Sequence, residues 1–251
     1  QSFDLAYEGL TGDLLVAYAT EAETTGLAYN TFSGGSWSAL TRYANMNEAF
    51  EHVDCATDPL TNNIICAAVG DTTDDMRVGV WDGAAWQGTN TDIDTGSTPA
   101  TYIAGRMYLS VGWLTAGDTK QGIIVYNDNN ANAINWVTVA TDGTFTSQTD
   151  NTAATPMPAG GIAYSDIIMD PINNDRLLYI FQDTTNFDIF AKRLIMTSAP
   201  AFTWSDANAG AVINASPTTA ASEAFHLAYD LYYDLTVGNG TNPANLSVGQ
   251  S

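Results

Sequence analysis

The feature that most constrains this chain is an internal repeat. The turn sequence Asp-Pro-Leu-Thr-Asn-Asn at 58–63 returns 112 residues later as Asp-Pro-Ile-Asn-Asn-Asp at 170–175. A second pair of turns, Asp-Thr-Thr-Asp at 71–74 and Asp-Thr-Thr-Asn at 183–186, has the same offset. Two turns in one register, separated by an apolar stretch, indicate that units of one structure recur along the chain.

Each unit ends with a turn and an aromatic residue, and these aromatics are Trp37, Trp86, Phe145 and Trp204. Within the second unit we expect four short strands, near 52–57, 64–69, 76–81 and 85–88, with Asp, Asn and Gly in the hairpin turns between them. A repeated four-stranded unit of about 40–50 residues is the signature of a propeller blade. We therefore predict an all-β fold: a β-propeller of about five blades, with a plain β-sandwich as the alternative.

The predicted propeller covers residues 1–237, and a polar C-terminal tail follows at 238–251. Its units are 1–47, 48–98, 99–156, 157–213 and 214–237. The fifth unit opens with Phe-His-Leu-Ala-Tyr-Asp at 225–230, which repeats the Phe-Asp-Leu-Ala-Tyr-Glu of 3–8. Because this unit is short, we expect the last blade to be incomplete or to be completed by other chain segments.

The unit endings resemble degenerate Asp-boxes, the Ser-x-Asp-x-Gly-x-Thr-Trp hairpins of sialidase-like propellers. Trp-Asp-Gly-Ala-Ala-Trp at 81–86 keeps the Asp, Gly and Trp, and Asp-Gly-Thr-Phe at 142–145 replaces the Trp by Phe. The units also resemble the Trp-Asp-Gly-x-x-Trp repeats of large bacterial and archaeal surface proteins. This resemblance implies a secreted propeller, extracellular or at the cell surface, and it implies no activity.

Charge excludes two classes of partner. The 251 residues contain 7 Lys and Arg against 28 Asp and Glu, which gives a formal net charge of −21. Nucleic acids and anionic membranes both require a basic footprint, so neither is an expected partner. No apolar run reaches the roughly 18 residues of a membrane span, so we expect no membrane insertion.

Acidic residues recur at one position of the first strand of a unit. Asp4, Asp54 and Asp166 occupy it in three units, His226 occupies it in the fifth, and Leu109 is the nearest residue in the third. The first strand of a blade lines the propeller axis, so these side chains should form one level around it. Facing carboxylates favour a hard cation such as calcium. The alternative is that each Asp accepts hydrogen bonds from backbone amides.

A second acidic cluster, Asp71, Asp74 and Asp75, is another candidate calcium site. The alternative is that these turn residues bond their own backbone. Cys55 and Cys66 are the only cysteines and lie opposite each other across one hairpin. They form either a disulfide, which an extracellular setting favours, or two buried thiols. By the repeat, we expect the equivalent pairs to be Leu5–Val16 and Ile167–Leu178.

Two tryptophans fall outside the repeat. Trp113 and Trp136 are therefore candidate ligand-binding residues, because sugar rings stack on exposed aromatic faces. The alternative is that they are core residues of a divergent third unit. Asn239 and Asn245 begin glycosylation sequons in the tail.

No catalytic constellation is evident in the sequence. The arginines needed to grip a sialic-acid carboxylate do not share one position in the units, and no serine-hydrolase or metalloprotease motif occurs. We therefore expect a secreted or cell-surface structural or adhesive module that is not an enzyme. Its partners would be copies of itself or other surface-protein segments. The alternatives are a carbohydrate-binding, lectin-like propeller with glycans as partners and a sialidase-like glycoside hydrolase.

Overall fold

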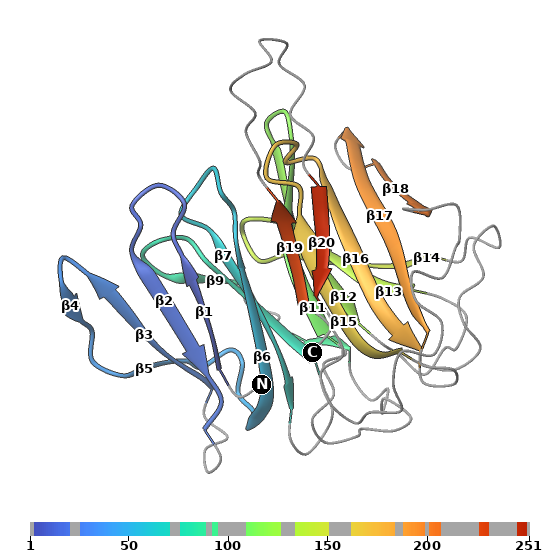
Figure 1. Ribbon diagram of the computed structural model, residues 1–251. Helices are drawn as coiled ribbons and strands as arrows, with labels where there is room; N and C mark the ends of the chain where they lie inside the picture. The colour runs from blue at the N-terminus through green and yellow to red at the C-terminus, as the bar shows by residue number, and fades with distance from the viewer. Residues whose placement is uncertain are drawn as a thin grey trace, which may run out of the picture.

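The protein is built from antiparallel β-sheets (Figure 1). The computed structural model describes residues 3–20, 26–70, 76–88, 92–94, 109–126, 134–150, 162–183, 188–198, 201–206, 226–230 and 245–249. These residues form strands, turns and irregular segments, and none of them is helical. The described part accordingly holds no helix that could cross a membrane.

Four sheets of four or five strands follow one another along the chain, one for each of the first four predicted units. The first blade contains β1 (Phe3–Tyr7), β2 (Leu14–Tyr18), β3 (Leu27–Ser33), β4 (Ser36–Trp37) and β5 (Thr41–Tyr43). The second contains β6 (Phe50–Thr57), β7 (Ile64–Gly70), β8 (Met76–Trp81), β9 (Trp86–Gln87) and β10 (Asp92–Asp94). These sheets confirm the predicted all-β architecture of repeated units.

The next two blades have four strands each. The third contains β11 (Leu109–Ala116), β12 (Thr119–Tyr126), β13 (Ile134–Val139) and β14 (Phe145–Asp150). The fourth contains β15 (Ile162–Met169), β16 (Arg176–Asp183), β17 (Ile189–Ser198) and β18 (Ala201–Asp206). A fifth, two-stranded sheet pairs β19 (His226–Asp230) with β20 (Asn245–Gly249). β20 thus lies within the stretch predicted as a polar tail.

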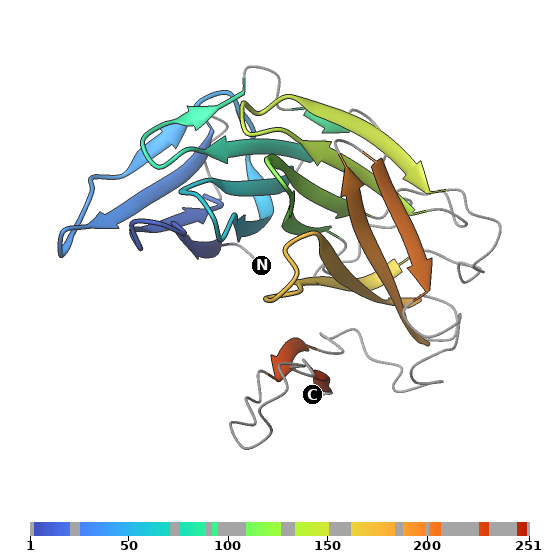
Figure 2. The same ribbon diagram turned by 90° about the horizontal axis from the view of Figure 1, so that it is seen from above.

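The first strand of each blade is its inner strand. β1 lies beside β6, β6 beside β11, β11 beside β15, and β15 beside β19. The other strands extend outward from this row, so the four blades fan into an arc, and the β19–β20 hairpin lies across its open side (Figure 2).

The core consists of apolar layers between consecutive blades. Alternation along β2 buries Leu15 and Ala17 on the face that meets the second blade. The central strand β7 is buried at every position, because both of its faces are covered. Burial on two faces accounts for its continuous run of apolar and small residues.

The turns set the register of each inner hairpin. Cys55 pairs with Cys66 and Leu5 with Val16, as the repeat predicts. Ile167 pairs with Tyr179, however, and not with the predicted Leu178. The reason is a longer turn: the Asp58 N–H donates to the Asn63 carbonyl, whereas the corresponding bond of the fourth blade runs from Asp170 to Arg176. The extra residue shifts every later position of β16 to the opposite face.

Candidate functional site

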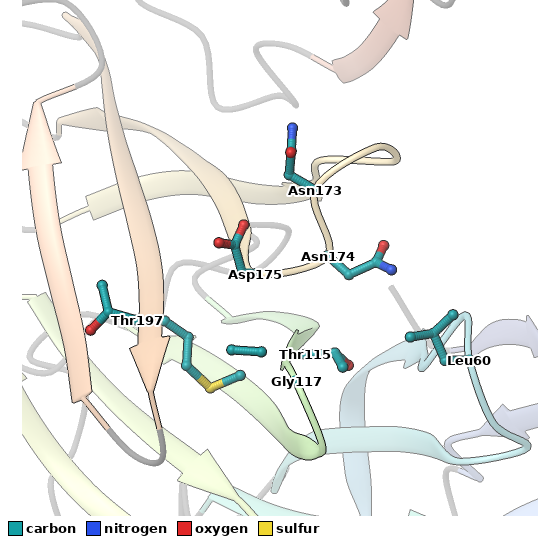
Figure 3. Close-up of a pocket in the computed structure, with 9 residues that line it drawn as sticks. Leu60, Thr115, Gly117, Asn173, Asn174, Asp175 and Thr197 are labelled. Atoms are coloured by element: carbon teal, nitrogen blue, oxygen red, sulfur yellow. The ribbon is translucent and has the colours of Figure 1, made fainter.

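A pocket of about 400 Å³ lies among three blades (Figure 3). It is found at what we call the turn end of the arc, where the β6–β7, β11–β12 and β15–β16 turns lie. Its lining residues are Leu60, Thr115, Ala116, Gly117, Asn173, Asn174, Asp175, Met196 and Thr197. The pocket therefore combines amide, hydroxyl and carboxylate groups with a few apolar side chains.

Backbone hydrogen bonds between strands hold this pocket in shape. The Thr115 N–H donates to the Asn174 carbonyl at 2.7 Å, which joins the third blade to the fourth. The Met196 N–H donates to the Asp175 carbonyl at 2.8 Å, which ties the long turn to β17. The Asp170 carboxylate accepts from the N–H groups of Ile172 and Asn173 and fixes the start of the turn.

Some polar groups of the lining are already engaged. The Asn173 amide donates to Asp170 at 2.9 Å, and the Asp175 carboxylate pairs with the Arg176 guanidinium at 2.8 Å. The Thr197 hydroxyl donates to the Ala201 carbonyl at 3.3 Å.

Two polar groups of the lining remain unengaged. The Thr115 hydroxyl is buried, and it has no hydrogen-bond partner among the described residues. The Asn174 side-chain amide also makes no hydrogen bond within this part of the chain. A buried polar group without a partner is costly unless a ligand or water satisfies it. Sequence analysis missed both residues. Asn174 lies in a turn whose extra residue the repeat concealed, and the burial of Thr115 without a partner depends on how the blades pack.

The inner-strand aspartates lie at blade junctions and bond the neighbouring backbone. The Asp4 carboxylate accepts from the Cys55 N–H at 2.8 Å, and the Asp54 carboxylate accepts from the Val111 N–H at 2.9 Å. Each acid therefore joins its own blade to the next. These contacts match the alternative to calcium binding, in which each Asp accepts hydrogen bonds from backbone amides. The amides belong to the neighbouring blade.

Asp4 and Asp54 are also hydrogen-bonded to each other. Burial raises the pKa of Asp54 well above its ordinary value, and the nearby Asp4 charge raises it further. Burial also raises the pKa of Asp4. Two buried carboxyl groups this close resist ionising together, so the protonated form of Asp54 is favoured. Catalytic carboxylates of retaining glycosidases stand about 5 Å apart with a sugar between them, and carboxyls in direct contact leave no such space.

The third unit differs from the prediction at this level. Ser110, rather than Leu109, occupies the aspartate position, since the N–H of the following residue, Val111, donates to Asp54 just as the N–H of Cys55 donates to Asp4. The hydroxyl groups of Ser110 and Ser165 lie 2.9 Å apart. The Asp166 charge acts on Asp54, which places a third carboxylate near the pair. His226 begins β19, beside β15.

No three His, Cys, Asp or Glu side chains of the described residues are grouped so that they could hold a metal ion. Calcium therefore stays a prediction, without support from the geometry at Asp4 and Asp54. Asp71, Asp74 and Asp75 lie outside the described residues, as does Asn239. Asn245 begins β20.

The structure places the other predicted residues in the interior. Trp113 is 1% exposed and donates from its indole N–H to the Ala56 carbonyl, and Trp136 is 5% exposed. Covered ring faces cannot stack on a sugar, so both tryptophans are core residues instead of the predicted ligand-binding residues. Cys55 and Cys66 are joined by a disulfide within the first hairpin of the second blade.

Comparison with known proteins identifies the architecture. No family model matches the sequence, and no curated protein matches it. Among solved structures, an α-L-arabinofuranosidase from Fusarium graminearum in complex with an iminosugar inhibitor matches 99% of this chain and 74% of its own, with a TM-score of 0.54 and 11% identity. The Aleuria aurantia lectin in complex with Fucα1-6GlcNAc matches 82% of this chain and 59% of its own, with a TM-score of 0.46 and 14% identity.

A neuraminidase-like protein from a flat-faced bat isolate matches 80% of this chain and 50% of its own, with a TM-score of 0.42 and 10% identity. These comparisons contradict our prediction of a purely structural or adhesive module, because the structure matched over almost the whole chain is a glycoside hydrolase. They leave open whether this chain is itself an enzyme. The all-β fold of this chain is a β-propeller, as the repeat predicts.

Proposed function

We propose that this propeller binds a neutral carbohydrate in the turn-end pocket. The observation that carries the proposal is the buried, unpartnered Thr115 hydroxyl, which shares the pocket with the unengaged amide of Asn174. Each hydroxyl group of a sugar can both donate and accept a hydrogen bond, so one sugar can satisfy a threonine hydroxyl and an asparagine amide together.

The rest of the lining suits the same class of ligand. Leu60 and Ala116 offer apolar surface to the C–H face of a sugar ring. The volume of about 400 Å³ lies within the range of small-molecule sites. Asp175, together with the net charge of −21, disfavours an acidic sugar. We therefore favour neutral sugars over sialic acid.

We also propose an extracellular setting. The Cys55–Cys66 disulfide supports it, since such bonds persist in oxidising compartments. The turns at the unit endings support the resemblance to Asp-box hairpins. Asp82 accepts from the N–H groups of Ala84 and Ala85, and Asp142 accepts from that of Thr144.

The test is titration calorimetry against a panel of neutral mono- and disaccharides. The Asn174→Ala variant keeps the backbone carbonyl that receives Thr115, so the fold should be retained while affinity falls about tenfold or more, as expected for the loss of a buried polar contact. Ser36→Ala, in the β3–β4 hairpin of the first blade, is the control and should bind as the wild type does.

Absence of binding to every neutral sugar would overturn the proposal, as would an Asn174→Ala variant that binds normally. The same samples should be analysed for released sugar. Its release would make this chain a hydrolase as well as a binding protein.

A further inference from the structure

In the second and fourth blades, the tryptophan that ends the unit packs on the preceding blade. Trp86 stacks on Tyr43 of the first blade, with ring centroids 5.0 Å apart and an interplanar angle of 10°. Trp204 packs edge-on against Trp136 of the third blade. Trp37, which ends the first unit, is instead 56% exposed. The first blade therefore presents to solvent an aromatic ring that is covered in these two other blades.

Trp37 and Trp86 hold the same place in their blades. Each lies on a two-residue strand and pairs with an aromatic residue of the neighbouring strand: Trp37 with Phe32, and Trp86 with Trp81. The ring centroids of Phe32 and Trp37 are 5.1 Å apart, and those of Trp81 and Trp86 are 5.8 Å apart. Within the described part of the chain, Phe32 is the only ring in contact with Trp37. The stacking position that Tyr43 fills at Trp86 thus has no ring in it at Trp37.

The contacts of Tyr43 show what kind of group fits such a position. Its flat ring stacks on Trp86, and its hydroxyl group donates to the Gly88 carbonyl at 2.6 Å. A sugar offers the same combination, since its C–H face stacks on an aromatic ring while its hydroxyl groups make hydrogen bonds. Near Trp37, Asn30 lies on the same face of β3 as Phe32, and its amide donates to the Ser38 carbonyl at 3.0 Å. The second amide hydrogen is left for a ligand.

A row of paired residues extends from Trp37 across the first blade. Trp37 pairs with Phe32, Phe32 with Leu14, and Leu14 with Tyr7 on the inner strand. Residues paired in this way lie on one face of the sheet, and Tyr7 is 59% exposed. We call these four residues the aromatic platform. It spans three strand spacings, or about 14 Å, so its two ends can contact different sugars of one chain.

We propose that the aromatic platform binds a linear neutral polysaccharide. It is a second site, because it lies in the first blade, whereas the residues of the turn-end pocket come from the second, third and fourth. β4, which carries Trp37, lies at the outer end of its blade, far from the β19–β20 hairpin (Figures 1 and 2).

The charge distribution favours a neutral ligand. Residues 26–41, which contain β3 and β4, include no Asp, Glu, Lys or Arg, although the whole chain has 28 acids. An acidic polysaccharide would be repelled by the net charge of −21, and this stretch holds no carboxylate that could pair with a basic one.

A second copy of the chain is the rival occupant. Contact between two platforms would bring together two molecules that each carry a charge of −21, and their repulsion opposes it. A stable protein interface also needs about 800 Å² from each partner. An aromatic side chain buries at most about 250 Å², so Tyr7 and Trp37 together fall short of that area.

The test is electrophoresis in native gels that contain a neutral soluble polysaccharide: mixed-linkage β-glucan, xyloglucan, galactomannan or arabinan. The acidic chain migrates and the polysaccharide does not, so binding retards the protein. At least one of these polymers should retard the wild type. Trp37→Ala should raise the apparent Kd about tenfold or more, because a large aromatic contact is lost, and Trp37→Tyr should preserve most of the affinity.

Ile172→Ala is the matched control, since Ile172 is a 47% exposed apolar residue in a turn of the fourth blade, and it should be retarded like the wild type. Equal melting temperatures of Trp37→Ala and the wild type would confirm that the variant folds. Absence of retardation by every polymer would overturn the proposal, as would normal retardation of Trp37→Ala.

Asn174→Ala separates this site from the turn-end pocket. Retardation lost in Asn174→Ala but kept in Trp37→Ala would assign the polysaccharide to the pocket and overturn the platform. Retardation lost only in Trp37→Ala would support the platform, whatever the pocket binds. Light scattering tests the rival occupant: a wild-type dimer that Trp37→Ala converts to a monomer would overturn the proposal in favour of a second copy.

Discussion

Asp54 shows how one side chain can link two blades and also titrate. Its carboxyl group accepts from the Val111 N–H and is bonded to Asp4, and burial raises its pKa well above the usual value. The folded state therefore holds a proton that the unfolded chain releases at about pH 4. Because the folded state binds more protons, the free energy of unfolding falls as pH rises from about 4 through the raised pKa.

Asp54→Asn should remove this dependence on pH. The amide can accept from Val111 and donate to Asp4 without titrating, so the melting temperature of the variant should exceed that of the wild type near neutral pH and approach it near pH 4. Thermal unfolding followed by circular dichroism across this range is the measurement.

Asp142→Asn is the matched control for this experiment. The Thr144 hydroxyl and N–H lower the pKa of Asp142, so this exposed carboxylate stabilises the fold above its ordinary pKa and loses that effect as pH falls. Its replacement should leave the slope near neutral pH unchanged. If Asp54→Asn kept the wild-type slope, the raised pKa of Asp54 would not be the cause of the pH dependence.

At the scale of the element, the turn residues of each hairpin determine which residues of its two strands pair. The packing of one hairpin against another depends instead on contacts between backbone atoms. The strands and the Cys55–Cys66 register could be predicted because a turn fixes its own flanking pairs. The changed register that pairs Ile167 with Tyr179 could not be predicted, because one extra turn residue leaves the local sequence pattern nearly unchanged. The sequence also gave no sign that the first turn of one blade contacts the first turn of the next. The Gly9 N–H donates to the Thr61 carbonyl of the next blade at 2.8 Å.

Gly9→Ala should weaken the junction of the first two blades. A Cβ at this position would stand 2.5 Å from the Thr61 carbonyl oxygen and 2.6 Å from that of Asp58, and backbone atoms cannot turn aside as a side chain can. We expect a loss of about 1–3 kcal/mol in the free energy of unfolding, the usual cost of overpacking. Urea unfolding measures it, with Leu10→Ala as the control; a Gly9→Ala variant as stable as the control would contradict the described approach of the two turns.

At the scale of the whole molecule, charge and packing oppose each other. The apolar layers between blades hold the arc together, while the net charge of −21 tends to expand it. Salt screens this repulsion, because the Debye length falls from about 30 Å at 0.01 M to about 8 Å at 0.15 M ionic strength.

The melting temperature should therefore rise when NaCl is added over this range, by a few degrees for a domain of this size. CaCl₂ at matched ionic strength separates screening from specific binding. A larger rise in CaCl₂, reversed by EDTA, would support the predicted calcium site, and equal rises would count against it. A melting temperature that does not respond to NaCl would contradict the role of self-repulsion.

The sequence by itself determined the repeated units, the antiparallel hairpins and the placement of the two cysteines. All of these depend on side-chain alternation and on turn residues within a few positions of one another. Only the tertiary structure decided what the recurring residues do. Asp54 accepts a hydrogen bond from the N–H of a residue 57 positions away, and Trp113 is buried by the preceding blade. The residues that line the pocket come from three blades. Such contacts depend on how blades pack, and no local pattern in the chain encodes the distance between them.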